Sequence, residues 1–360
     1  MTPRTGFAVA AVLAASSAAM ARADTVEDFY RGKAMTMVIS TGVGGGYDVG
    51  GRVVARHFPK HIPGNPTMVP RNMPGAGHVR ATNFMAVQAP RDGTHVATVG
   101  NPIALHQILD GTGIHFDIAK LNWLGSSESS NGAVYVWANT GVKTIDDARK
   151  QEVLLGATGA GGGNLQYPAL MNNMLGTKFR VIAGYSTGSD IPLAMERGEV
   201  HGRANHSFSS LMAQRADWVT QNKINILAQI GLKPEVGFEN VPLLLDLAKN
   251  DTERAIIKLY SVPIALGRPV LTTPDVPAER IAALRRAFDA TMTDAEFLAD
   301  AKRSRLDVSP VSGVELQRII EDLVATPPAM IAAAKSAVEA KDVLKMSIGG
   351  DGEKPAAGEP

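Results

Sequence analysis

The sequence contains no cysteine, few aromatic residues and almost no net charge. Without cysteine, the 360-residue chain can form no disulfide, thiolate nucleophile, iron–sulfur cluster or cysteine zinc site. Aromatic residues make up only 5% of the chain, which leaves few platforms for stacking single-stranded bases. The 36 Lys and Arg residues are balanced by 35 Asp and Glu residues, whereas a nucleic-acid binder usually carries a basic excess. We therefore expect neither a nucleic-acid partner nor cysteine chemistry.

The first 23 residues are typical of an export signal. Arg4 gives a positive start, residues 7–20 form an Ala-rich apolar run, and Ala-Arg-Ala at 21–23 is a small-x-small cleavage site. The apolar run is shorter than the roughly 20 residues that a membrane span needs. We therefore expect cleavage before Asp24 and a periplasmic location. Cleavage would leave 34 basic and 35 acidic side chains, a net charge of −1.

The rest of the chain predicts two α/β lobes. Its length favours about two domains, and 45% hydrophobic residues suffice for packed cores. Short apolar runs alternate with helical patterns, which is typical of parallel sheets. Strands are expected at 35–41, 67–69, 94–99, 121–124, 133–137, 153–157, 179–183, 224–230 and 262–266. Helices are expected at 49–58, 77–88, 165–175, 189–197, 243–250, 252–259, 278–291, 294–304 and 313–325. A disordered tail is expected at 346–360.

A glycine-rich loop follows a predicted strand in each lobe. The first is GVGGGYD at 42–48, and the second is GAGGGN at 159–164. Tyr47 stands where a dinucleotide fingerprint needs glycine, and no P-loop motif occurs, so we expect no nucleotide cofactor. Free backbone N–H groups at a helix N-terminus suit a carboxylate or another small anion. A loop that only turns the chain is the alternative.

The segment GYSTG at 184–188 matches the G-x-S-x-G motif of serine hydrolases, between a predicted strand and a predicted helix. The only histidines after Ser186 are His201 and His206, which are too close in sequence to return from a distant strand end. We therefore prefer a loop that contacts a ligand. A secreted serine esterase that uses Ser186 is the alternative function.

Two further features concern charged and metal-binding side chains. The eight histidines are scattered and include no H-E-x-x-H motif, so we expect no metal site. Arg203 lies among small residues near a predicted strand end, where its guanidinium could hold a carboxylate by two hydrogen bonds. A structural salt bridge is an equally open interpretation of Arg203.

A set of short motifs extends along nearly the whole chain. The motifs are 30–48 with its glycine-rich loop and Asp48, NMPGAG at 72–77, APRDGT at 89–94, GATGAG at 156–161, GYSTG at 184–188 with Pro192, RGEV at 197–200 and PDVPAER at 274–280. Together they resemble the tripartite tricarboxylate transporter receptors, also called TctC or Bug extracytoplasmic solute receptors, over about residues 28–340. The GYSTG segment lacks a lysine that the family usually has there, which leaves the identity of the ligand open.

The resemblance implies a type II periplasmic-binding-protein fold with two α/β lobes joined by hinge strands. Lobe one would comprise 24–128 plus 263–345, and lobe two 129–262. It implies a non-enzymatic, monomeric receptor without cofactor or metal, which captures a small carboxylate and delivers it to the membrane permease subunits of the transporter. The expected ligand contacts, with Arg203 added, are Gly44, Gly45, Gly46, Tyr47, Asp48, Asn72, Gly75, Gly77, Asn101, Thr158, Gly161, Asn164, Tyr185, Ser186, Asp190, Arg203 and Asn205.

Overall fold

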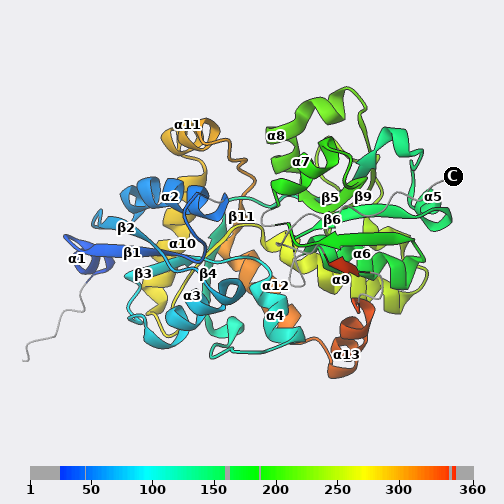
Figure 1. Ribbon diagram of the computed structural model, residues 1–360. Helices are drawn as coiled ribbons and strands as arrows, with labels where there is room; N and C mark the ends of the chain where they lie inside the picture. Colours follow the sequence, from blue (N-terminus) through cyan, green and yellow to red (C-terminus); the bar gives the residue numbers. More distant parts are fainter. Residues whose placement is uncertain (1–24, 45, 159–162, 186–187, 340–342, 346–360) are drawn as a thin grey trace, which may run out of the picture.

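The computed structural model describes residues 25–44, 46–158, 163–185, 188–339 and 343–345. The predicted export signal and the predicted tail lie outside the described residues, as do Gly45, Gly161 and Ser186. Two six-stranded sheets form two lobes that lie side by side, as Figure 1 shows. No helix among the described residues is long and apolar enough to cross a membrane.

The first sheet has the strand order β11-β4-β10-β3-β1-β2. Its strands are β1 (Ala34–Ile39), β2 (Thr67–Asn72), β3 (His95–Thr98), β4 (Asn122–Ser126), β10 (Pro269–Thr272) and β11 (Val311–Ser312). Strand β1 is parallel to β2 and β3, with Ile39 opposite Asn72 and Thr98. The loops that follow these strands therefore start from the same edge of the sheet, where open α/β sheets bind ligands.

The second sheet has the strand order β12-β7-β6-β8-β5-β9. Its strands are β5 (Gly132–Trp137), β6 (Val153–Ala157), β7 (Phe179–Ala183), β8 (Gly202–Ser207), β9 (Ile224–Ile230) and β12 (Val343–Lys345). Strand β6 is parallel to β7 and β8, whereas β5 is antiparallel to β8 and β9. Strand β12 pairs with β7, so the chain returns to the second lobe at its end, in contrast to the expected assignment of 263–345 to the first.

Helices cover both sheets. They are α1 (Val26–Tyr30), α2 (Gly46–His57), α3 (Val79–Asn83), α4 (Ile103–Leu109), α5 (Ile145–Lys150), α6 (Gly163–Leu175), α7 (Asp190–Glu196), α8 (Phe208–Thr220), α9 (Asp251–Leu266), α10 (Ala278–Met292), α11 (Ala295–Arg303), α12 (Gly313–Val324) and α13 (Pro328–Ala337). Single turns are η1 (Phe58–His61), η2 (Ala76–His78), η3 (Phe84–Gln88), η4 (Ile118–Lys120), η5 (Ala138–Thr140) and η6 (Leu244–Leu247). Side-chain caps start several helices, such as Thr144 at α5 and Ser312 at α12.

The predicted strand at 262–266 is wrong, because these residues form the last turns of α9. The helix is capped by Asn250, whose side chain accepts a hydrogen bond from the Glu253 backbone N–H, and it contains Pro263. Its C-terminal half is buried almost all round. A continuous apolar run can be a buried strand or a fully buried helix, and periodicity alone does not separate the two.

Two chain connections join the lobes next to each other. Residues 127–131 lead from β4 to β5, and residues 267–268 lead from α9 to β10. The Arg268 backbone N–H donates to the Glu128 carbonyl at 3.0 Å, and the Ser127 N–H donates to the Arg268 carbonyl at 3.4 Å. We call these paired connections the hinge.

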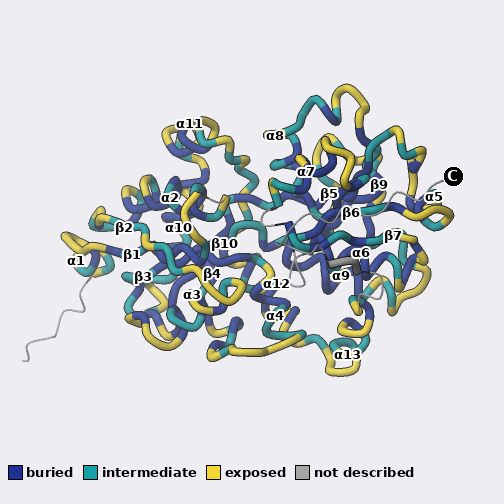
Figure 2. Tube along the Cα trace, viewed as in Figure 1, coloured by how far each residue is buried: buried dark blue, intermediate teal, exposed yellow. Residues whose placement is uncertain are grey.

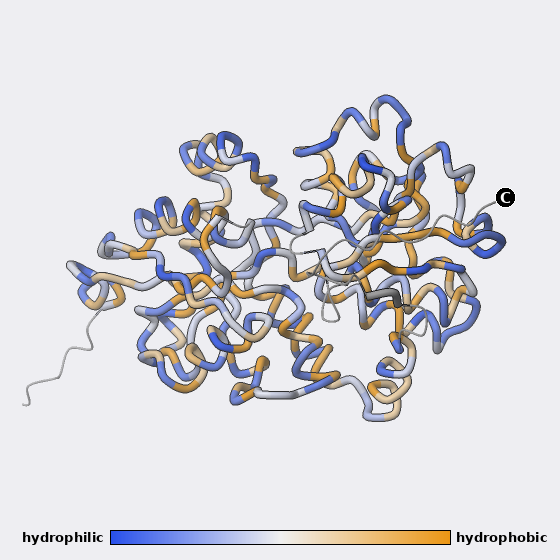
Figure 3. The backbone as a smooth tube through the Cα atoms, viewed as in Figure 1, coloured by the Kyte–Doolittle hydropathy of each residue, from blue (hydrophilic) through white to orange (hydrophobic). Residues whose placement is uncertain are grey.

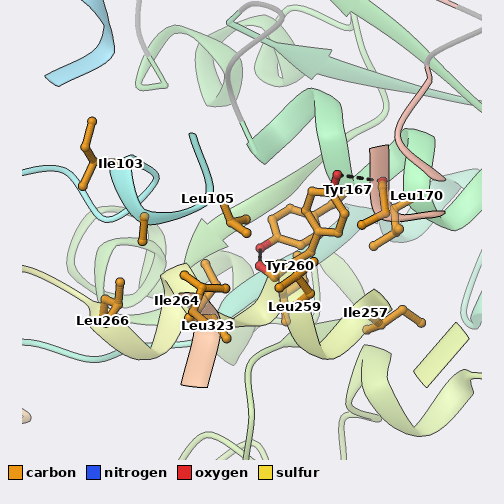
Figure 4. Packing of buried hydrophobic residues seen from close by; sticks show 14 of the residues in the cluster. Ile103, Leu105, Tyr167, Leu170, Ile257, Leu259, Tyr260, Ile264, Leu266 and Leu323 are labelled. Atoms are coloured by element: carbon orange, nitrogen blue, oxygen red, sulfur yellow. Dashed lines mark hydrogen bonds between the residues drawn. The ribbon is translucent and has the colours of Figure 1, made fainter. Parts of the chain in front are cut away.

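One buried apolar core contains residues of both lobes. Figure 2 colours the chain by burial and Figure 3 by hydropathy, and buried and hydrophobic stretches occur in both lobes. Figure 4 shows the centre of this core, where the Tyr167 hydroxyl of α6 donates to the Tyr260 carbonyl of α9 at 2.6 Å. The Tyr260 hydroxyl donates to the Ala334 carbonyl of α13 at 2.9 Å. Helices of both lobes are thereby packed together on this side, whereas α8 and α11 stand opposite each other at the top of Figure 1.

Candidate functional site

A cavity of about 670 Å³ lies between the lobes, next to the hinge. Its described lining comes from the first lobe (Gly44, Gly46, Tyr47, Val49, Asn101, Ser304, Arg305, Leu306, Asp307), the hinge region (Glu128, Ser130, Ile264, Gly267, Arg268) and the second lobe (Gly132, Gly188, Ser189, Arg203, Asn205, His206, Ser207, Ser209, Ser210, Ala213, Gln214). Most of these residues are polar or glycine. The cavity therefore suits a polar ligand that touches both lobes.

Tyr47 fixes the first-lobe wall of the cavity. It lies in the first turn of α2, and its hydroxyl donates to the Gly267 carbonyl of the hinge at 3.3 Å. The same hydroxyl accepts a hydrogen bond from the Asn101 backbone N–H at 3.1 Å. Burial raises the pKa of Tyr47, so the hydroxyl stays protonated. Tyr47 thus ties the loops after β1 and β3 to the hinge.

Asp48 does not line the cavity, although the sequence predicted it as a ligand contact. Its carboxylate is 2% exposed and accepts hydrogen bonds from the Gly44 N–H, the Asn72 amide and the Arg52 guanidinium. Burial alone would raise its pKa, but these three donors lower the pKa below the usual value for aspartate. The role visible for Asp48 and Asn72 is to hold the first glycine-rich loop in place.

An ion pair between Glu128 and Arg268 crosses the hinge. Arg268 Nε lies 2.6 Å from Glu128 Oε2, and the side chains are only 20% and 6% exposed. Arg268 Nη1 also donates to the Gly46 carbonyl at 2.6 Å, while Ser209 at the start of α8 donates to Glu128. The pair therefore links α2 of the first lobe to α8 of the second. Because Glu128 neutralises Arg268, this arginine is not a free anion-binding group.

A β-bulge in β8 shapes the second-lobe wall. His206 pairs with Ala133 and Arg203 with Tyr135, so Ala204 and Asn205 of β8 lie opposite a single residue of β5. Asn205 takes up the extra length with a left-handed backbone, φ 54°. A bulge reverses the usual alternation of side chains. As a result Arg203, Asn205 and His206 all line the cavity, whereas Ala204 points into the core.

The side chain of Asn205 lies between two glycines. A Cβ atom at Gly132 would be 2.4 Å from Asn205 Oδ1, and one at Gly163 would be 2.2 Å from Asn205 Nδ2. Any larger residue at either position would displace the amide. The glycine at the start of α6 is therefore needed to admit a side chain from the neighbouring strand.

Arg203 is a buried cation without a carboxylate partner among the described residues. It is 9% exposed, and Nη1 donates to the Gly188 carbonyl at 2.6 Å. Its Nε has no hydrogen-bond partner within the part of the chain that the structure describes. Burial lowers the pKa of Arg203, which reflects the cost of keeping the charge away from water. Of the two interpretations left open by the sequence, a structural salt bridge is not found among the described residues.

His206 lies beside Arg203 and is neutral. Its Nδ1 is 2.9 Å from the Tyr135 hydroxyl, and the ring is 3% exposed. Burial, followed by the charges of Arg203 and Arg215, lowers the pKa of His206 well below the usual value. Among the described second-lobe residues that line the cavity, Arg203 therefore carries the positive charge.

Six of the ligand contacts predicted from the sequence line the cavity, namely Gly44, Gly46, Tyr47, Asn101, Arg203 and Asn205. Eight predicted residues are described but do not line it, namely Asp48, Asn72, Gly75, Gly77, Thr158, Asn164, Tyr185 and Asp190. Asn164 accepts a hydrogen bond from the Thr158 N–H at 3.3 Å, and the Tyr185 hydroxyl donates to Glu199. Gly45, Gly161 and Ser186 lie outside the described residues.

Sequence reasoning missed the residues of the hinge and of α8. These residues belong to no motif. Glu128 and Arg268 lie in the two connections of the hinge, and Ser209 lies in the first turn of α8. These residues belong to one site only because the two connections of the hinge lie next to each other in the folded chain. The position of His206 in the second-lobe wall depends on the bulge, which no sequence motif indicates.

Two histidines of the first lobe, His57 and His61, contact carboxylates outside the cavity. His57 Nε2 lies 3.0 Å from Asp300 Oδ2, and His61 Nε2 lies 3.0 Å from Asp294 Oδ2. Asp294 and Glu296 also bind the Lys60 ammonium, at 2.8 Å and 2.7 Å. Although His57, Asp294 and Glu296 are close enough to surround an ion, Lys60 supplies the positive charge there. The cluster fastens α11 to α2.

No family model matches the sequence. The UPF0065 protein in the gbd 5′ region of Cupriavidus necator is 28% identical over 294 residues, which cover 78% of this chain and 82% of that protein. In fold, the chain is similar to a TctC solute-binding protein from Polaromonas, with a TM-score of 0.65, 20% identity and coverage of 86% of this chain and 99% of the other.

A second solved structure, an R. palustris protein with adipate, gives a TM-score of 0.59 at 17% identity and covers 84% of this chain and 97% of the other. These likenesses confirm the expected two-lobed fold of type II periplasmic binding proteins. They also support the resemblance to the TctC and Bug receptors that the motifs indicated.

Proposed function

We infer that the chain is a solute receptor of the TctC/Bug family, and we propose that it captures a small carboxylate in the cavity between its lobes without chemically changing it. The export signal expected at residues 1–23 would send the protein to the periplasm. There it would deliver the ligand to the membrane permease subunits of a tripartite tricarboxylate-type transporter. We propose that it acts as a monomer.

The observation that carries this proposal is the unpaired charge of Arg203. A buried guanidinium is costly unless an anion accepts its hydrogen bonds. The described residues supply only the Gly188 carbonyl, and Nε is left without a partner. A carboxylate is planar and matches the donor geometry of a guanidinium. Binding a carboxylate at Arg203 would therefore satisfy the site.

The arrangement of the walls favours capture by closure. Arg203 and Asn205 lie on the second lobe, whereas Tyr47 and Asn101 lie on the first. A ligand that contacts both walls stabilises the state in which the lobes are close together. The neighbouring structure from R. palustris contains adipate, which agrees with a carboxylate as the ligand class.

The proposal is tested by thermal unfolding with a panel of mono-, di- and tricarboxylates. A carboxylate at 100 times its dissociation constant should add about 2.7 kcal/mol to the free energy of unfolding and raise the melting temperature by several degrees. Arg203→Gln should weaken binding at least tenfold, because a charge-assisted hydrogen bond is lost. If no carboxylate shifts the melting temperature of the unaltered protein, the proposal fails.

Arg215→Gln is the matched control for Arg203→Gln. It removes the same charge from the same lobe, but Arg215 binds Glu196 and does not line the cavity. Its carboxylate affinity should stay within about twofold of the unaltered protein. Equal losses in the two variants would point to a general charge effect instead of a contact at Arg203.

The comparisons give no support to the alternative of a serine esterase. A receptor should bind carboxylates and release them unchanged, whereas an esterase should hydrolyse activated esters and lose that activity in Ser186→Ala. Turnover of p-nitrophenyl esters that disappears in Ser186→Ala would overturn the proposal that the protein is not an enzyme.

A further inference from the structure

We propose that an apolar groove next to the cavity receives the body of the ligand, so that the captured solute is a monocarboxylate with several apolar carbons. This inference rests on the proposed function, since it takes the carboxylate to be held at Arg203. The groove has a volume of about 690 Å³ and lies between α8 and the 235–238 loop on one side and α11 and residues 305–308 on the other.

Apolar side chains from both lobes form the walls of this groove. Met212, Val236 and Phe238 come from the second lobe, and Leu298, Leu306 and Val308 come from the first. Phe238 packs on the fully buried Phe208 with ring centroids 4.2 Å apart, which fixes its position. Each lobe thus offers half of an apolar surface that a ligand between the lobes would complete.

Two of these apolar side chains are exposed to solvent. Val236 is 89% exposed and Leu298 is 40% exposed, and they come from opposite walls of the groove. Apolar surface in water is a cost that association removes. A hydrocarbon placed between them would cover both at once.

The groove and the cavity form one continuous space. They share Ser209 and Ala213 of α8 and residues 305–307 of the first lobe. A ligand with its carboxylate at Arg203 would therefore have a path past the start of α8 into the groove. This continuity is why we assign the groove to the ligand and not to a separate partner.

The charges of the groove do not favour a second carboxylate at the far end of the ligand. Lys302 and Arg305 are offset by Glu235 and Asp307, all within the same lining. The net charge of these four side chains is zero, in contrast to the unpaired Arg203 in the cavity. The groove therefore favours an apolar end over a charged one.

The test is isothermal titration of the full-length mature protein with butanoate, hexanoate and octanoate, with suberate as the dicarboxylate of the same length as octanoate. Each added methylene should tighten binding about fourfold while the chain fills the groove, and octanoate should bind more tightly than suberate. Equal affinities along the series, or tighter binding of suberate, would overturn the inference and leave carboxylate capture intact. Binding of none of these acids, nor of any in the wider panel, would remove both proposals.

A pair of variants tests whether the apolar chain of the ligand lies in the groove. Leu298→Ser in α11 should weaken octanoate binding by roughly fivefold to tenfold and change butanoate binding by less than about twofold, because only the longer chain reaches it. The matched control is Leu193→Ser in α7, since Leu193 is 43% exposed on a helix away from the groove. If both variants bind octanoate equally well, the groove does not contact the ligand. Circular dichroism of both variants checks that they are folded.

Discussion

Arg203 and His206 lie three positions apart on the same strand and face the same cavity, yet they carry different charges. Arg203 keeps its proton because its ordinary pKa is far above neutrality, whereas burial and the nearby arginines lower the pKa of His206. The described cavity lining contains Arg203, Arg268 and Arg305 against Glu128 and Asp307, and this net charge of +1 favours one negative group. The neutral imidazole can then accept or donate a hydrogen bond without adding charge.

The lowered pKa of His206 predicts that acid destabilises the protein. A histidine in the unfolded chain has a pKa near 6.5, so below about pH 6.5 the unfolded state binds a proton that the folded state does not. This contribution to stability is complete above about pH 6.5 and is lost as the pH falls towards the lowered pKa of the folded state, by about 1 kcal/mol per pH unit. His206→Gln should flatten this part of the profile in urea unfolding between pH 7 and 5.

His115 provides the control for that measurement, because its side chain is exposed. His115→Gln should leave the pH dependence unchanged. His206→Gln should also lower stability at pH 7, since the contact with the Tyr135 hydroxyl changes. An unaltered slope in His206→Gln would show that another group causes the loss in acid.

At the scale of elements, the hinge is held by a chain of polar contacts from α2 through Arg268 and Glu128 to α8. The carboxylate of Glu128 is almost fully buried, and Arg268 is its cationic partner. Removing one member of a buried pair leaves the other charge uncompensated. The pair therefore helps to hold the glycine-rich start of α2 and the serine-rich start of α8 in position beside the cavity.

Arg268→Gln should lower the free energy of unfolding by about 3 kcal/mol, at the lower end of the range for a broken buried pair because the arginine is partly exposed. The double variant Glu128→Gln/Arg268→Gln should recover part of this loss, since no charge is left buried. The control is Arg180→Gln, whose pair with Glu152 is 40% and 53% exposed and should contribute less than about 1 kcal/mol. Urea unfolding would contradict the prediction if all three variants were equally stable.

At the scale of the whole molecule, the lobes are joined differently on two sides. Helices α6, α9 and α13 are packed together around Tyr167 and Tyr260, whereas α8 and α11 face each other across the groove (Figures 1 and 4). Close-packed cores resist deformation. Closure should therefore rotate the lobes about the packed side and bring α8 and α11 together.

This motion can be measured directly because the chain has no native cysteine. Spin labels at Ala299→Cys in α11 and Gln221→Cys at the end of α8, both exposed positions, should give a shorter and narrower distance distribution when a bound carboxylate is present. A pair within the first lobe, Ala299→Cys with Lys120→Cys, should not change. A ligand that binds without altering the inter-lobe distance would contradict closure.

Local patterns in the sequence were enough to predict two α/β lobes, because strand and helix periodicity depends on near neighbours. The same patterns predicted that Tyr47, Asn101, Arg203 and Asn205 would approach one cavity. They did not separate Asp48 and Asn72, which fasten the loop, from residues that face the cavity. Which way a polar side chain in a loop points depends on partners such as Arg52 that the motif does not specify.

What the sequence determined by itself is therefore the α/β character of the two lobes and the positions of glycines and small residues after the strands. The tertiary structure alone decided that a bulge aims Arg203 and His206 at the same space, that 262–266 is a buried helix and that β12 returns to the second lobe. Each of these outcomes depends on contacts between residues far apart in the chain. These contacts are stabilised by burial of apolar side chains and by pairing of strands, and a local sequence pattern specifies neither.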